Sequence, residues 1–156
     1  MDFSRITIIL YLVLMWIGGG AQSTAGGIKV NTFVVALASF RSLVKGEHAT
    51  SLFNREIAYN SIRRTLVVVF GSICIIAFFY IGLLALEPDL PSMDLLFETI
   101  SAFSTVGSSL GITSLLGNAS KLWLVLLMFL GRVGFITVLM SILPKKELPS
   151  YRLPKE

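Results

Sequence analysis

Two short glycine-containing turns carry the residues best suited to chemistry in this sequence. Both have the pattern Ser-Thr-small-Gly, one at residues 23–26 and the other at residues 104–107. Glycine permits positive φ and close approach of the backbone, so successive carbonyl oxygens of such a turn can point into one lumen. Carbonyl oxygens arranged in this way replace the water shell of a cation. The predicted ion-binding residues are therefore Ser23, Thr24, Ala25, Gly26, Gly27, Ser104, Thr105, Val106, Gly107 and Ser108.

The segments around these turns form an internal repeat. A short apolar segment precedes each turn, at residues 6–17 and 93–103, and a further apolar segment follows each one. Apolar segments of about a dozen residues are too short to cross a bilayer and are typical of re-entrant or buried helices. Irregular backbone at membrane depth must line a cavity or lie within protein. The pattern predicts pore loops, in which a short helix directs its negative C-terminal end at the ion.

The composition indicates an all-α membrane protein. The chain has 156 residues, of which 54% are hydrophobic and only 14% are charged, whereas about a quarter are charged in a typical soluble domain. Residues 65–86 contain no charge, and residues 122–143 contain only Arg132. Each run is long enough, at about 1.5 Å per residue, to cross a hydrocarbon core of about 30 Å. We therefore predict two membrane spans.

The charge distribution predicts the orientation of these spans. Basic residues gather in residues 41–64 and after residue 144, whereas residues 87–98 carry four acidic residues and no basic one. Because Lys and Arg are retained on the cytoplasmic side, both basic segments are expected inside and the acidic segment outside. The net charge of +4 does not indicate a nucleic-acid partner, since the basic residues are not interleaved with exposed aromatic residues.

Several other features have simpler interpretations. Gly71 and Gly82, in the uncharged span, are read as helix-packing positions. Lys29 does not follow a glycine directly, so residues 26–29 do not match a phosphate-binding loop. Cys74 and His48 are the only residues of their types, and no carboxylate lies inside either predicted span. The sequence therefore offers no set of groups that would make a membrane enzyme.

Two charged residues need a role or a partner. Arg132 lies near the middle of the second span, where a charge costs about 2.5–3.5 kcal/mol on insertion scales. One hypothesis is that Arg132 faces the permeation path, holds a gating segment through its carbonyls and opposes cation leak. The alternatives are a structural ion pair and a side chain that snorkels to the interface. For Glu98 three roles stay open: attraction of cations, capping of backbone amides behind the turn, and a plain outer-surface charge.

Three motifs resemble the Trk/Ktr/HKT superfamily of potassium transporters, and most of all its bacterial Ktr and Trk membrane subunits. Residues 18–29 (GGGAQSTAGGIK) resemble that family's third pore loop, and residues 97–111 (FETISAFSTVGSSLG) resemble its fourth. Residues 129–134 (FLGRVG) resemble its arginine-bearing final helix. The resemblance implies potassium uptake through a pore of four covalently joined repeats, with Gly26 and Gly107 as filter glycines. No cofactor is implied, and sodium is the alternative transported ion.

The same resemblance implies a division of the chain. Residues 1–46 would form the pore helix, filter loop and broken inner helix of the third repeat, with the break inside residues 36–46. Residues 47–62 would be a cytoplasmic connection, residues 63–144 the fourth repeat, and residues 145–156 a cytoplasmic tail. That is about one and a half of the expected four repeats, so we expect the sequence to be a fragment that lacks the first filter position.

The family resemblance also implies a location and partners. A multi-pass protein of the cytoplasmic membrane, surrounded by lipid, is expected to form a homodimer and to bind a cytosolic ring of nucleotide-binding regulatory subunits. A secondary transporter for sodium or a small solute, built on broken helices around a midplane site, is the alternative class. Flux that saturates with an organic solute would favour this alternative, whereas competition among alkali-metal ions would favour the pore.

Overall fold

The computed structural model describes residues 4–20, 26–46, 51–52, 55–57 and 59–133. Helices dominate these residues, which confirms the predicted all-α class in its broad form. One short antiparallel hairpin, in which Ser51 pairs with Glu56, was not predicted. The elements are α1 (Arg5–Trp16), α2 (Val30–Val44), β1 (Ser51–Leu52), β2 (Arg55–Glu56), α3 (Tyr59–Leu86), α4 (Ser92–Phe103) and α5 (Asn118–Val133).

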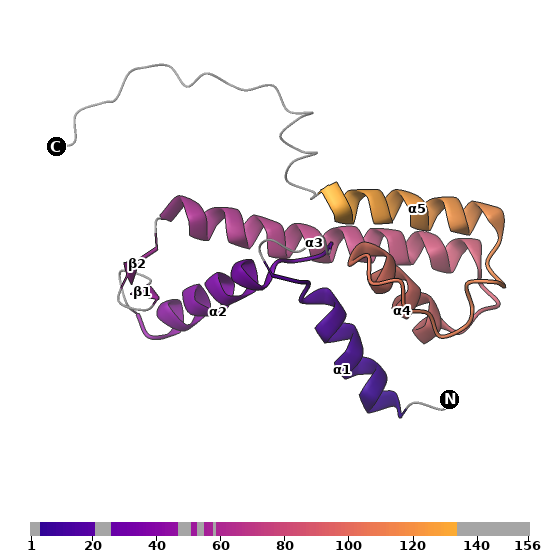
Figure 1. Cartoon of the computed structure of the whole chain (residues 1–156), viewed down its shortest axis with the longest axis horizontal. Helices are drawn as coiled ribbons and strands as arrows, with labels where there is room; N and C mark the ends of the chain where they lie inside the picture. The colour runs from indigo at the N-terminus through magenta and orange to yellow at the C-terminus, as the bar shows by residue number, and fades with distance from the viewer. Residues whose placement is uncertain (1–3, 21–25, 47–50, 53–54, 58, 134–156) are drawn as a thin grey trace, which may run out of the picture.

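The longest helix, α3, organises the others (Figure 1). Helix α2 lies along its first half and α5 along its second half, while α4 packs against both α3 and α5. In the described part of the chain, the segment Ser61–Leu86 of α3 is the one helix long and apolar enough to cross a membrane. This segment contains the first predicted span. The second predicted span, residues 122–143, is described only to residue 133, where it is helical.

The core lies between α3, α4 and α5. Leu83, Leu95 and Leu127, one from each helix, are fully buried. At Gly82 an added Cβ would lie 2.7–2.8 Å from three atoms of the Trp123 indole, so only glycine lets the ring lie against α3. The indole nitrogen of Trp123 donates to the carbonyl of Phe79 at 3.0 Å. The helix-packing role predicted for Gly82 is confirmed.

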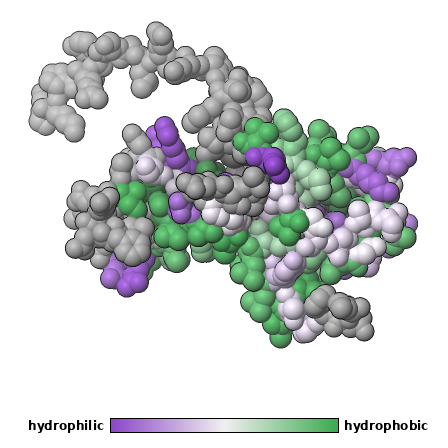
Figure 2. All heavy atoms as spheres, viewed as in Figure 1, coloured by the Kyte–Doolittle hydropathy of each residue, from purple (hydrophilic) through white to green (hydrophobic). Residues whose placement is uncertain are grey.

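Apolar side chains cover much of the coloured part of the face seen in Figure 2. On α3 alone, Phe70 is 71% exposed and Ile81 is 65% exposed, although both lie in the apolar segment Ser61–Leu86. A helix that is apolar all round belongs within protein or within a membrane rather than at a water interface. The exposed apolar faces of α3 therefore fit the membrane character that the composition predicts.

The start of α5 is fixed by a carboxylate from the end of α3. One carboxyl oxygen of Glu87 accepts hydrogen bonds from the Ser120 hydroxyl and the Gly117 amide, both at 2.7 Å. These two donors, with the Ser120 hydroxyl first, hold the pKa of Glu87 below its ordinary value because they favour the charged form. Glu87 lies just beyond the apolar segment, where water reaches it.

Glu87 should make the stability of this end of the fold depend on pH. Because its pKa is depressed in the folded state, its contribution is present above the unfolded pKa and is lost as the pH falls through the folded pKa. Glu87→Gln in the complete purified protein should therefore lower Tm at pH 7. It should leave Tm unchanged at a pH below the folded-state pKa of Glu87, where the carboxyl is protonated. Asp89→Asn, at an exposed turn position, is the matched charge control. An equal Tm loss at both pH values would contradict this assignment.

Candidate functional site

The second glycine turn begins where α4 ends, in a closed C-terminal cap. The Val106 amide donates to the carbonyl of Ser101 at 3.0 Å, and the Thr105 amide donates to the carbonyl of Ala102 at 3.1 Å. This pair of bonds is the Schellman arrangement, which needs a left-handed residue just after the helix. Here that residue is Thr105, with φ +52°. A β-branched residue with positive φ is an outlier, and such strain clusters at functional sites.

The first glycine turn holds Thr105 in place. The Gly26 amide donates to the hydroxyl oxygen of Thr105 at 2.8 Å, although the two residues lie 79 positions apart. The next pair of residues is also close, because a Cβ on Gly27 would lie 3.1 Å from the hydroxyl oxygen of Ser104. Ser104 is 1% exposed, and its hydroxyl has no hydrogen-bond partner in the part of the chain that the structure describes.

Helix α5 meets the two turns at the same point. A Cβ on Gly131 would lie 1.9 Å from the carbonyl oxygen of Phe103, so the two backbones approach as closely as glycine allows. A Cβ on Gly26 would lie within 3.0–3.1 Å of three oxygens, those of the Phe103 carbonyl, the Thr105 hydroxyl and the Gly131 carbonyl. We call this contact of Gly26, Phe103, Thr105 and Gly131 the glycine junction. It joins α4, α5 and the first turn.

The chain between α1 and α2 returns on itself to reach the glycine junction. The Gly18 amide donates to the carbonyl of Ile28 at 2.7 Å, and the Val30 amide donates to the carbonyl of Gly19 at 3.3 Å. Ile28 is 1% exposed, and Gly27 has φ +75°. The described residues on the two sides of this connection, 17–20 and 26–29, therefore lie side by side.

The two turns do not occupy equivalent positions, although their residue types match. Gly107 lies four residues beyond the end of α4 at Phe103, whereas Gly26 lies ten residues beyond the end of α1 at Trp16. Residues 23–25 lie outside the described residues. An ion-binding role for residues 23–27 and 104–108 thus stays a prediction, and the second turn alone follows its helix directly.

The predicted break inside residues 36–46 is wrong for most of that range. Helix α2 runs through Val44 and ends at Lys45 and Gly46, where Gly46 has φ +69°. Residues 30–44 contain no glycine or proline, and the Ser39 hydroxyl bonds to the Val35 carbonyl at 2.8 Å within the helix. Nothing in this stretch interrupts the helical hydrogen bonds. Between α1 and α2 the structure describes non-helical backbone at residues 17–20 and 26–29.

The two charged residues singled out from the sequence have different surroundings. Arg132 lies in the last turn of α5 beside Gly131 of the glycine junction and is exposed. Glu98 is only 6% exposed, and its carboxyl accepts hydrogen bonds from the hydroxyls of Ser109 and Thr113. The outer-surface role for Glu98 is therefore wrong. Neither Ser109 nor Thr113 was predicted, since spacing alone does not reveal contacts across a turn.

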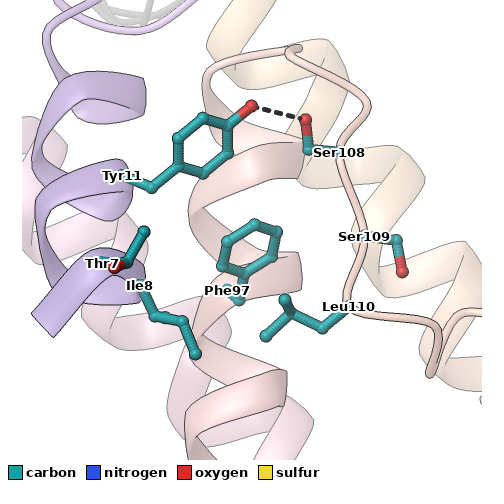
Figure 3. Close-up of a pocket in the computed structure, with 7 residues that line it drawn as sticks. All are labelled: Thr7, Ile8, Tyr11, Phe97, Ser108, Ser109 and Leu110. Carbon is teal, nitrogen blue, oxygen red and sulfur yellow. Dashed lines mark hydrogen bonds between the residues drawn. The ribbon is translucent and has the colours of Figure 1, made fainter. Parts of the chain in front are cut away.

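A contact between α1 and the second turn was also missed from the sequence. The hydroxyl of Tyr11 lies 3.0 Å from that of Ser108, and the Tyr11 ring stacks on Phe97 with the ring centroids 5.8 Å apart. Figure 3 shows these side chains around a cavity of about 310 Å³. The lining residues are Thr7, Ile8, Tyr11, Phe97, Ser108, Ser109 and Leu110. Helices α1 and α4 thus present a tyrosine and a phenylalanine to the end of the second turn.

The apolar segment Ser61–Leu86, of membrane-spanning length, and its exposed apolar side chains fit a membrane protein. A family profile described as TrkH, cation transport protein, matches residues 2–154. Because this match covers nearly the whole chain, the protein belongs to the TrkH family of cation transport proteins. The predicted superfamily resemblance is confirmed.

Individual relatives agree with the family. The chain is 40% identical to the Ktr system potassium uptake protein B of Bacillus subtilis over 157 residues, which cover 99% of this chain and 35% of that protein. It is 34% identical to the potassium/sodium uptake protein NtpJ of Enterococcus hirae over 161 residues, covering 100% of this chain and 36% of that protein. The chain thus spans about a third of the length of these relatives. Their names describe transport rather than catalysis.

Proposed function

We propose that the complete protein takes up potassium across the cytoplasmic membrane through a pore in which residues 104–108 bind the ion. The observation that carries this proposal is the strained Thr105, held at the end of α4 by the cap and by Gly26. The names of two relatives, a potassium uptake protein and a potassium/sodium uptake protein, support the ion class. Sodium is kept as the alternative ion.

The physical basis is the oxygen-rich end of a short helix. The aligned peptide dipoles of a helix give its C-terminus about half a negative charge, and α4 ends directly at residues 104–108. Gly107 is exposed and has φ +79°, a conformation that turns the backbone without a side chain in the way. Carbonyls of this turn, with those of equivalent turns elsewhere in the complete protein, would replace the hydration shell of potassium.

For the loop of residues 17–29 we propose a position on the ion path as well. The sequence predicts a second filter at Ser23–Gly27, and the matching residue types support that role. Its different offset from the preceding helix and its contact with Gly131 favour a gating segment instead. If this loop is a filter, substitution of Gly26 should alter the discrimination between ions. If it is a gating segment, the same substitution should alter the rate of ion flux.

Arg132 is proposed to act on this loop. It follows Gly131, whose backbone lies close to Gly26 and Phe103, so Arg132 is the next residue along α5 after the glycine junction. A positive charge there can hold loop carbonyls and oppose cation leak.

Arg132→Gln in the complete protein should therefore raise rubidium influx at least about fivefold, the lower end of typical coupling between sites, while leaving ion discrimination unchanged. The influx is measured in cells without their own uptake systems. Lys121→Gln, an exposed charge near the start of α5, is the matched control. Unchanged influx in the Arg132 variant would count against the gate.

The remaining organisation follows the sequence predictions. We propose a multi-pass topology with residues 47–62 and 145–156 on the cytoplasmic side, a fourth repeat over residues 63–144, and the end of a third repeat over residues 1–46. A homodimer with a cytosolic regulatory subunit is proposed from the resemblance, and the system names of the relatives support a multi-component assembly.

The simplest test of the proposed function is growth. The complete parent protein should restore growth at low external potassium to cells that lack their own potassium uptake systems. Growth that the protein restores only when an organic solute is supplied would favour the secondary transporter. Failure to restore growth, with the protein present in the membrane, would contradict the proposal.

A further inference from the structure

Glu98 is the one carboxyl group in α4 that is buried, and it is used within the fold. Its Oε1 accepts hydrogen bonds from the hydroxyls of Thr113, at 2.7 Å, and Ser109. A buried polar group is costly unless it is hydrogen-bonded, so these two donors account for its place inside the protein. Both donors belong to the segment that leaves the second turn after Gly107. We call this segment, residues 108–113, the return arm.

A second side chain of α4 holds the same segment. The hydroxyl of Ser101 donates to the carbonyl of Ser108 at 2.6 Å. Ser101 lies three residues after Glu98, and residues three apart share one face of a helix. The Ser109 hydroxyl oxygen also accepts from the Gly111 amide at 2.9 Å, and Gly111 has φ +101°. The return arm is thus attached to one face of α4 at its beginning and at its end.

We propose that Glu98 is a positioning residue that fixes the ion-binding turn by anchoring the return arm to α4. This inference rests on the proposed function of residues 104–108. The turn is held at its start by the helical cap at Thr105 and beyond Gly107 by the return arm. Because one rigid helix provides both attachments, the separation of the two ends of the turn is fixed, and so are the carbonyl positions between them.

The Glu98 carboxyl acts here as a hydrogen-bond acceptor, so the variants are chosen to keep or to remove that acceptor. Glu98→Gln keeps a side-chain oxygen that can accept from Ser109 and Thr113, whereas Glu98→Ala leaves both hydroxyls without it. Loss of two hydrogen bonds of ordinary strength corresponds to a change of about tenfold. Glu98→Ala in the complete protein should therefore lower the discrimination of potassium over sodium about tenfold, and Glu98→Gln should lower it far less.

Two further sets of variants are the controls for this comparison. Ser109→Ala combined with Thr113→Val removes the donors instead of the acceptor and should reproduce the loss if Glu98→Ala does not fold. Asp94→Ala, in the first turn of the same helix, removes an acidic side chain that has no hydrogen bond to the return arm among the described residues. It should leave discrimination unchanged.

The deciding measurement is made in two parts on the complete protein. Discrimination is taken from sodium inhibition of rubidium uptake, and amide hydrogen exchange of residues 106–113 is followed in purified protein. We expect Glu98→Ala to lower discrimination and to speed exchange in the return arm about tenfold, with both effects small in Glu98→Gln. Unchanged exchange in Glu98→Ala, or equal effects of alanine and glutamine, would overturn the inference. Faster exchange in a protein whose wild type carries no rubidium would support the anchor and refute the proposed function instead.

Discussion

Gly131→Ala is expected to damage the complete protein more than Gly26→Ala or Gly20→Ala. The new Cβ would lie 1.9 Å from the carbonyl oxygen of Phe103, and that atom belongs to the backbone of α4. A backbone oxygen cannot rotate away as a flexible side chain can, so α5 and α4 must separate. Overpacking typically costs about 1–3 kcal/mol and occasionally more, and we expect the upper end. Rubidium uptake should fall at least about tenfold, since about 1.4 kcal/mol already corresponds to that factor.

Two other glycines, where an added methyl group would have more room, serve as comparisons for Gly131→Ala. Gly26→Ala adds a methyl group 3.0–3.1 Å from three oxygens of the glycine junction and should have a smaller effect. Gly20→Ala adds one where nothing lies within 4 Å and should leave Tm unchanged. The measurement is thermal unfolding of the purified proteins alongside rubidium uptake. A Gly131→Ala protein with the Tm and uptake of the wild type would contradict the close approach of α5 to α4.

Gly107→Ala should weaken ion discrimination with little effect on packing. Nothing lies within 4 Å of the new Cβ, but φ is +79°, and a side chain in the left-handed region costs about 1–2 kcal/mol. The turn can relieve this strain only by rotating the peptide groups that the proposed function assigns to ion binding. Discrimination of potassium over sodium should therefore fall about tenfold, the factor that corresponds to about 1.4 kcal/mol.

A glycine outside the turn separates strain from ion binding. Gly46 has φ +69° and open space around its Cβ position, and it lies at the end of α2. Gly46→Ala should lower Tm about as much as Gly107→Ala does, because both glycines have positive φ, but it should leave the discrimination of potassium over sodium unchanged. The readout is inhibition of rubidium uptake by sodium in both variants. Equal loss of discrimination in the two would show that strain anywhere in the fold has this effect.

The lengths of the short helices could be predicted because local sequence sets them. The apolar segments at residues 6–17 and 93–103 correspond to α1 and α4 to within one residue at each end. Gly18 follows the first segment and Pro91 precedes the second, and these residue types interrupt helices. Helix α3 was expected from residue 65 but begins at Tyr59. Hydropathy detects the apolar part of a helix, and a polar first turn lies outside it.

The glycine junction could not be predicted from the sequence. It joins Gly26, Phe103, Thr105 and Gly131, whose separations along the chain follow no helical or strand period. The different offsets of the two turns were visible in the sequence, but the matching residue types led to one role for both turns. Glycine content did indicate non-helical backbone at residues 18–20 and 26–27, yet the break was expected within α2. Burial of Glu98 was missed because its partners, Ser109 and Thr113, lie across the turn.

We propose that this chain contributes to a potassium-selective pore. The most direct test is rubidium flux into liposomes that contain the purified complete protein, with potassium, sodium and an organic solute as competitors. We predict saturable rubidium entry. Potassium should inhibit it strongly, sodium weakly and the organic solute not at all, and in Gly107→Ala the difference between potassium and sodium should become smaller. Rubidium entry that only the organic solute suppresses, or that Gly107→Ala leaves unaltered, would contradict the account.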